Sequence, residues 1–173
     1  MSDRLSDYGY SFQIKIVSAL LRDSSFLQQV HDILEASYFE NESIRWLSES
    51  VISYHLEYKE SPTLEVFKVM SNDVEDKVLQ TQIVDNLKDV IANLEATDLE
   101  FVKSQTLDFC RNQNLKKAIM TSVDLLQSGD YDGIKSTIDT AMKAGTERNI
   151  GLEYADNVQE RYTVNVRDCV PTE

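Results

Sequence analysis

The sequence predicts an all-α protein with a compact multi-helix head, a protruding antiparallel helical hairpin and a short helical linker tail. Apolar residues recur at helical spacing from Tyr10 onward. Proline and glycine, which a sheet protein of this size needs for its turns, occur only 2 and 5 times in 173 residues. The expected divisions are a flexible N-terminus (1–9), the head (10–96), the hairpin (97–145) and a linker (146–173).

Three helices are expected in the first part of the head. The first starts at Tyr10 and ends near Arg22. The second starts at Ser24 or Ser25, which are both good N-cap residues, and Asn41 can cap the third. Their expected core-facing residues are Phe12, Ile16, Ala19, Leu20, Phe26, Leu27, Val30, Ile33, Leu34, Ile44, Leu47, Val51, Tyr54 and Tyr58.

Two further helices complete the predicted head. Pro62 ends the third helix and suits the start of a short fourth one. Asn72 and Glu75 have the spacing of a capping box and are expected to open the fifth helix. Trp46 lies off the main stripe of its helix, so it is either core on a second face or an exposed anchor for a partner.

The longest helical pattern starts at a capping box formed by Thr97 and Glu100 and runs to about Gln127. Its apolar stripe changes phase across residues 111–114, which predicts a bend or a change of packing partner. The stripe of the first half is Leu99, Val102, Thr106 and Cys110.

Gly129 and Asp130 are a C-cap and an N-cap residue, so together they predict a tight reversal into a returning helix that ends at Gly145. Helix, tight turn and helix form an αα-hairpin. A protruding hairpin cannot bury both sides of its apolar stripes against itself, so one side is offered to a partner. The residues expected at that oligomer interface are Leu115, Ile119, Val123, Leu126, Ile134, Ile138 and Met142.

Charge and length limit the partners and the compartment. The formal net charge is -13, with 30 acidic and 17 basic side chains, and such a chain repels phosphate backbones and anionic membranes. Direct DNA binding and membrane binding are therefore not expected. The N-terminus lacks the apolar core of a signal peptide, and no run reaches the roughly 18 apolar residues of a membrane helix. A cytoplasmic location is expected.

No enzyme signature is found. The sequence GDYDGIKS, which starts at Gly129, lacks the glycine spacing and the lysine position of a phosphate-binding loop. His31 and His55 are expected to be surface or half-buried structural histidines, and Cys110 and Cys169 to be free thiols. We therefore expect no catalytic residue, no metal and no cofactor in this chain.

Several segments, in order, resemble the N-terminal domain and linker of DnaB-type replicative DNA helicases, closest to the T-even phage form. The first stretch, from Phe12 to Met70, matches the family's Leu-Leu-x-Asp helix end at residues 20–23. Phe39 matches its aromatic anchor in a loop, and residues 63–64 match its Thr-Leu helix start.

The remaining segments cover most of the rest of the chain. Residues 108–119 resemble the family's long hairpin helix, 152–162 its phage linker and 170–173 the lead into the ATPase. Residues 71–74 stand where bacterial members carry a Gly-Gly element and further helical residues, which is a departure shared with the phage form. The linker residues that the resemblance implies are Leu152, Tyr154, Val158 and Tyr162.

The resemblance implies a non-catalytic collar domain of a hexameric helicase. Its hairpins would pair subunits into dimers, the dimers would build a hexameric ring, and the ring would dock primase and a helicase loader. ATP and Mg would belong to a motor domain that follows the present sequence. The alternative is a stand-alone acidic helical adaptor or inhibitor of a replication protein, suggested by the net charge.

Overall fold

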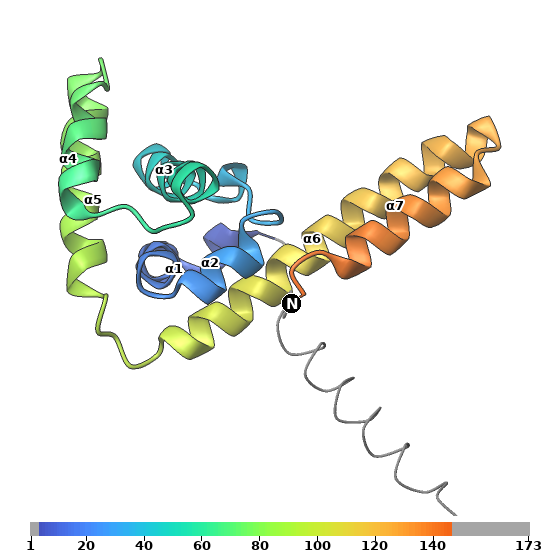
Figure 1. Cartoon of the computed structure of the whole chain (residues 1–173), viewed down its shortest axis with the longest axis horizontal. Coiled ribbons are helices and arrows are strands. Elements are labelled where there is room, and N and C mark those ends of the chain that lie inside the picture. The colour runs from blue at the N-terminus through green and yellow to red at the C-terminus, as the bar shows by residue number, and fades with distance from the viewer. Residues whose placement is uncertain (1–3, 147–173) are drawn as a thin grey trace, which may run out of the picture.

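The computed structural model describes residues 4–146, and the elements of that range are helices and helical turns without a strand. The all-α prediction is confirmed. A helical head carries a long hairpin that projects away from it (Figure 1). The α-helices are α1 (Tyr10–Arg22), α2 (Ser24–Val30), α3 (Glu42–Tyr58), α4 (Leu64–Asn72), α5 (Lys77–Ala92), α6 (Leu99–Ser128) and α7 (Tyr131–Lys143), with 3-10 turns η1 (Leu5–Tyr8) and η2 (Ala36–Tyr38).

The core of the head is built around α1. This helix packs against α2, α3, α5 and the first part of α6. Ile16, Val17 and Leu20 of α1 are completely buried. Burial of an aliphatic side chain of this size contributes about 1.5–3 kcal/mol, so α1 is the main hydrophobic anchor of the head.

The N-terminal segment corrects one prediction. Residues 1–9 were expected to be flexible, but Leu5 is completely buried and belongs to η1. Tyr8 stacks on Phe12 with 4.7 Å between the ring centroids. The sequence signal was hidden because one leucine among polar residues forms no periodic pattern.

Most helix starts are capped by acidic or amide side chains. Asn41 caps α3 by accepting a hydrogen bond from the Ser43 N–H, as predicted. The predicted caps of α2 and α5 are wrong. Asp23, not a serine, caps α2, and Asp76 caps α5 while Asn72 is the last residue of α4. In both places a neighbouring aspartate takes the N-cap position, where its negative charge also interacts favourably with the helix dipole.

The predicted capping box at Thr97 is also absent. Asp98 is the N-cap residue of α6, and its side chain makes no capping hydrogen bond. Its carboxylate is instead 2.5 Å from the Lys15 ammonium of α1. The Asp98 carboxylate therefore makes an ion pair that joins the start of α6 to the head, and it does not cap the helix.

The helix α6 is continuous through residues 111–114, and it changes its packing partner there, which is one of the two predicted outcomes. Its first half packs into the head, with Val102, Phe109 and Cys110 in the hydrophobic core. Its second half packs along α7. The head and the hairpin therefore share one continuous helix (Figure 1).

The structure places the two histidines and the tryptophan of the head. His55 is buried, with 8% exposure, which corrects the surface or half-buried expectation, whereas His31 is half-buried. Trp46 is half-buried and its ring centroid is 6.5 Å from that of Phe67. Contact with the completely buried Phe67 favours the core interpretation of Trp46.

Candidate interaction surface

The hairpin is closed by the residues that the sequence indicated. Gly129 has φ 73°, and its N–H and that of Asp130 donate to the last carbonyls of α6, those of Leu126 and Leu125. Asp130 then caps α7 by accepting a hydrogen bond from the Gly133 N–H at 2.9 Å. This turn fixes α6 and α7 as antiparallel neighbours.

Small side chains line the seam between the two helices. Ala118 of α6 and Ala141 of α7 are the buried residues of this part of the hairpin. The Asn114 amide donates to the Ala141 carbonyl at 3.4 Å, which sets the register of the two helices. Because alanines occupy the seam, the larger apolar side chains lie beside it.

Four of the seven predicted interface residues are exposed to solvent by half or more. Their exposed fractions are 51% for Ile119, 50% for Val123, 57% for Leu126 and 69% for Met142. The other three, Leu115, Ile134 and Ile138, are half-buried beside the seam. The structure therefore leaves an apolar surface that no described part of this chain covers.

Helix geometry places these residues on one side of the hairpin. Each residue advances about 100° around its helix. Counted from Ala118, the positions of Ile119, Val123 and Leu126 lie about a quarter turn further round. Met142 and Ile138 are displaced in the same sense from Ala141. Because the two helices are antiparallel, the same sense of rotation from the seam leads to the same side of the pair.

Tyr131 joins this side and was missed by sequence reasoning. It is 71% exposed and lies at the start of α7, three residues before Ile134. The helical spacing to Ile134 and Ile138 was the available signal. We call the following set the hairpin face: Leu115, Ile119, Val123, Leu126, Tyr131, Ile134, Ile138 and Met142.

The opposite side of the hairpin is polar. A quarter turn from the seam in the other sense, the helices carry mainly hydroxyl and charged residues. They are Lys117, Thr121, Asp124 and Ser128 on α6, and Ser136 and Thr140 on α7. The hairpin is therefore amphipathic across its width, and only one side is suited to association with an apolar surface.

Polar contacts tie the base of the hairpin together and link it to the head. The Arg111 guanidinium donates to the Gly145 carbonyl at 2.6 Å, which ties the end of α7 back to α6. Lys117 pairs with Glu35 of the head and lies 5.6 Å from the centre of the Tyr38 ring. These contacts and the continuous α6 helix connect the hairpin to the head.

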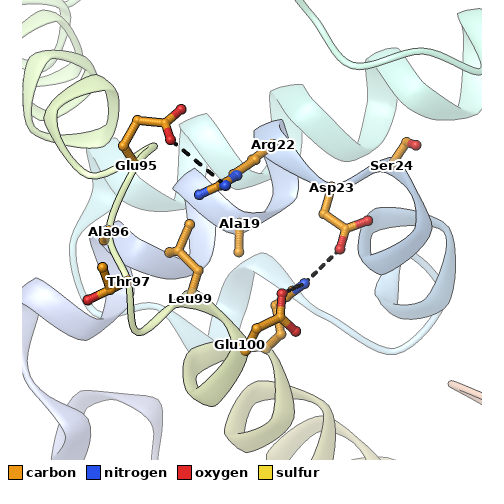
Figure 2. Close-up of a pocket in the computed structure, with 10 residues that line it drawn as sticks. Ala19, Arg22, Asp23, Ser24, Glu95, Ala96, Thr97, Leu99 and Glu100 are labelled. Carbon is orange, nitrogen blue, oxygen red and sulfur yellow. Dashed lines mark hydrogen bonds and ion pairs between the residues drawn. The ribbon is translucent and has the colours of Figure 1, made fainter.

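A cleft of about 430 Å³ lies where α1, α2 and the start of α6 meet (Figure 2). Its two cations are already engaged. Arg22 donates to the Leu94 carbonyl at 2.8 Å, and the Lys103 ammonium is 2.7 Å from Asp23 and 2.5 Å from Glu100. The cleft is a structural junction between α6 and the head, and its charged groups neutralise one another.

The rings of His31 and His55 lie edge to face. Their ring centroids are 6.0 Å apart, and the Nδ1 atom of His55 is buried without a hydrogen-bond partner. Within residues 4–146, no group of three or more His, Cys, Asp or Glu side chains could hold a metal ion. Burial lowers the pKa of His55, and nearby His31 and Lys59 lower it further.

The remaining sequence-predicted positions lie outside the described residues. These are the four linker residues Leu152, Tyr154, Val158 and Tyr162, together with Cys169. Cys110 is a buried free thiol whose pKa is raised by burial to about 12. Among the described helices, none is both long and apolar enough to cross a membrane.

Comparisons of the chain with protein-family models, with curated proteins and with solved structures give no match.

Proposed function

We propose that this chain is a non-catalytic assembly domain that binds a second copy of itself through the hairpin face. In finer terms, we propose that it is the collar domain of a hexameric replicative DNA helicase. The observation that carries the proposal is the exposed apolar side of a hairpin that projects from the head.

The energetics favour a second copy as the occupant. A two-fold interface uses the same surface on both chains, so each residue of the hairpin face is buried twice. Full burial of a large apolar side chain contributes about 1.5–3 kcal/mol, and association costs about 4–15 kcal/mol in lost freedom. The four side chains exposed by half or more, doubled by symmetry, can gain only their exposed share, about 7–14 kcal/mol, which is of the same size as that cost.

The finer proposal is supported by the family resemblance. The segments that carry it are consecutive parts of the head, from α1 to α4, followed by the middle of α6. A collar needs no catalytic group, and the acidic surface keeps it from competing with the motor domain for DNA. Primase and a helicase loader are its proposed partners, and ATP with Mg would be bound by the motor domain.

Self-association is tested with a matched pair of variants of the same helix. Ile119→Glu places a charge at the centre of the hairpin face, and Phe101→Glu does so at a residue that is 61% exposed elsewhere on α6. Size-exclusion chromatography with light scattering should show the dimer of the native chain retained in Phe101→Glu and lost in Ile119→Glu. Equal behaviour of the two variants would contradict the use of this face.

The helicase identity is tested separately by reading the source gene beyond codon 173. A reading frame that continues into a strand and the sequence GxxxxGK[ST] supports a collar, because that loop binds the phosphates of ATP. A stop codon at that point rejects the collar of a motor protein and leaves a free-standing self-associating protein.

A second candidate function is an acidic adaptor or inhibitor, which the net charge of -13 favours. Such a protein would displace DNA from a basic replication protein. A fluorescence competition assay with labelled single-stranded DNA distinguishes it, because a collar domain leaves the DNA bound.

A further inference from the structure

The chain has only two histidines, and the fold brings them together. His31 directly follows the last residue of α2, and His55 lies in the last turn of α3. Their ring centroids are 6.0 Å apart, and the two ring planes are inclined to each other by 62°. The head therefore holds a pair of imidazoles that come from two different elements.

Hydrogen bonds with the backbone decide which nitrogen of each neutral ring carries the proton. Nδ1 of His31 is 2.7 Å from the Gln28 carbonyl oxygen, and a carbonyl only accepts, so this nitrogen is the N–H donor. The lone pair of His31 is then on Nε2. Nδ1 of His55 is buried without a hydrogen-bond partner, so the bond of this ring with the backbone of Glu60 belongs to its Nε2. The lone pair of His55 is therefore on Nδ1.

In these tautomers neither ring can satisfy the other. Each offers the other a lone pair, and two acceptors do not form a hydrogen bond. His55 is only 8% exposed and its Nδ1 atom is fully buried, so bulk water does not satisfy that atom either. A buried acceptor without a partner is destabilising. The pair lacks an electron-pair acceptor that both nitrogens can share.

We propose that Nε2 of His31 and Nδ1 of His55 together bind a late first-row divalent metal ion such as Zn²⁺. The proposal is independent of self-association through the hairpin face. Imidazole nitrogen is a preferred ligand of Zn²⁺ and its neighbours in the series. In metal sites, the other nitrogen of a ligating histidine usually donates to a carboxylate or a backbone carbonyl, and both rings make such a backbone bond here.

The separation of the two rings suits one shared ion. A Zn–N bond is about 2.0–2.1 Å long, which places the ion roughly 3.2 Å from the centre of a ligating ring. Two rings can thus share an ion when their centres are up to about 6.4 Å apart. The observed 6.0 Å lies within that limit. His31 is half-buried, so the ion and the water molecules that complete its coordination can enter beside this ring.

A shared ion would connect two parts of the head. The helix α2 packs against α1 and α6, and the ion would add a link from its end to the last turn of α3. The ammonium of Lys59 is a nearby charge that opposes a cation, but this side chain is exposed and water screens it. Because an ion that binds only the folded chain stabilises it, Zn²⁺ should raise the melting temperature.

Titration calorimetry of the full chain with Zn²⁺ tests the site. All proteins carry Cys169→Ser, and the remaining thiol, that of Cys110, is buried. Zn²⁺ should bind one site of this parent chain. Loss of a residue that only orients a metal ligand weakens binding about 10–100-fold, so loss of a ligand in His31→Ala or His55→Gln should weaken it at least tenfold. Mg²⁺, which prefers oxygen ligands, should not compete.

His31→Ala is the decisive variant, because it changes a half-buried side chain and leaves the buried His55 in place. Unchanged Zn²⁺ affinity in this variant would overturn the proposal, since carboxylates of the acidic chain would then be the ligands. A parent chain that binds no Zn²⁺ would overturn it as well.

Nitrogen-15 NMR of the imidazole rings identifies the atoms. Zn²⁺ should shift the signals of His31 Nε2 and His55 Nδ1 together, while the other nitrogen of each ring keeps its proton. A shift confined to His31 would mean an ordinary surface histidine and would overturn the shared site. A hydrogen bond from a protonated His31 to His55 Nδ1 that persists in excess Zn²⁺ would also overturn it, because a proton would then satisfy the pair.

Discussion

The carboxylate of Asp23 joins the head to the hairpin helix through its two oxygens. Oδ1 accepts hydrogen bonds from the backbone N–H groups of Ser25 and Phe26 at the start of α2. Oδ2 is 2.7 Å from the ammonium of Lys103, which belongs to α6. One side chain therefore caps a helix of the head and holds the helix that continues into the arm.

Replacement of Asp23 separates these two roles. Asp23→Ala should lower the free energy of unfolding by about 1–2 kcal/mol, because the helix loses its cap and Lys103 loses a partner. Asp23→Asn should cost less, since asparagine still caps well. Urea denaturation of the three proteins measures the difference, and equal losses for both variants would contradict a capping role.

The same carboxylate makes stability dependent on acid pH. Burial alone would raise its pKa, but the Lys103 ammonium and the two backbone N–H groups outweigh burial, and the pKa lies below the usual value of 3.8. The stabilisation is therefore present above about pH 4 and is lost as pH falls through the lowered pKa. The amide of Asp23→Asn does not titrate, so the melting temperature of this variant should fall less than that of the native chain below pH 4.

His55 gives a second pH dependence, in a different range. Burial, then His31 and Lys59, lower its pKa below 6.5, so the folded state binds its proton less readily than the unfolded chain does. Stability should fall as pH drops below about 6.5 and level off below the lowered pKa. Melting temperatures between pH 5 and 8 measure this, and a His55→Gln variant with an unchanged slope would contradict it.

Two glycines of the hairpin provide a matched comparison. Gly129 and Gly145 both have positive φ, at 73° and 68°. A Cβ at Gly129 meets nothing within 4 Å, whereas one at Gly145 meets the Ile33 side chain too closely. Gly129→Ala should cost about 1 kcal/mol from backbone strain alone. Gly145→Ala should lower the free energy of unfolding clearly more, because its methyl group also clashes with Ile33. An equal loss for the two variants in urea denaturation would mean that the Ile33 side chain moves aside at little cost.

The Cys110 thiol should be unreactive in the folded protein. It is completely buried in the core and its pKa is raised to about 12, so almost no thiolate is present at pH 8. In a Cys169→Ser variant, a chromogenic disulfide reagent should label Cys110 only at the rate of unfolding. Rapid labelling of the native protein would mean that α6 separates readily from the head.

Local rules were sufficient wherever neighbouring residues decide the structure. Gly129 and Asp130 were predicted to make the reversal, and Asn41 was predicted as a cap, because each acts on backbone groups within a few residues. The stripe from Leu99 to Cys110 was likewise predicted and is buried. Such features follow from helical periodicity and capping chemistry alone.

Long-range partners decided the rest. Asp98 makes an ion pair with Lys15, and nothing within its own helix signals that pair. Leu5 is core only because the packed helices leave a site for it. On the hairpin, the apolar residues of the proposed interface were predicted as a set. Which of them are half-buried depends on how far each helix is rotated about its own axis when Ala118 faces α7. Local sequence patterns do not determine that rotation.

Sedimentation equilibrium of the native chain over a wide concentration range measures self-association itself. We expect a reversible dimer with twice the 19.8 kDa mass of one chain, because the hairpin face leaves apolar side chains open to a second copy. A mass of one chain at every concentration, up to the millimolar range, would contradict it.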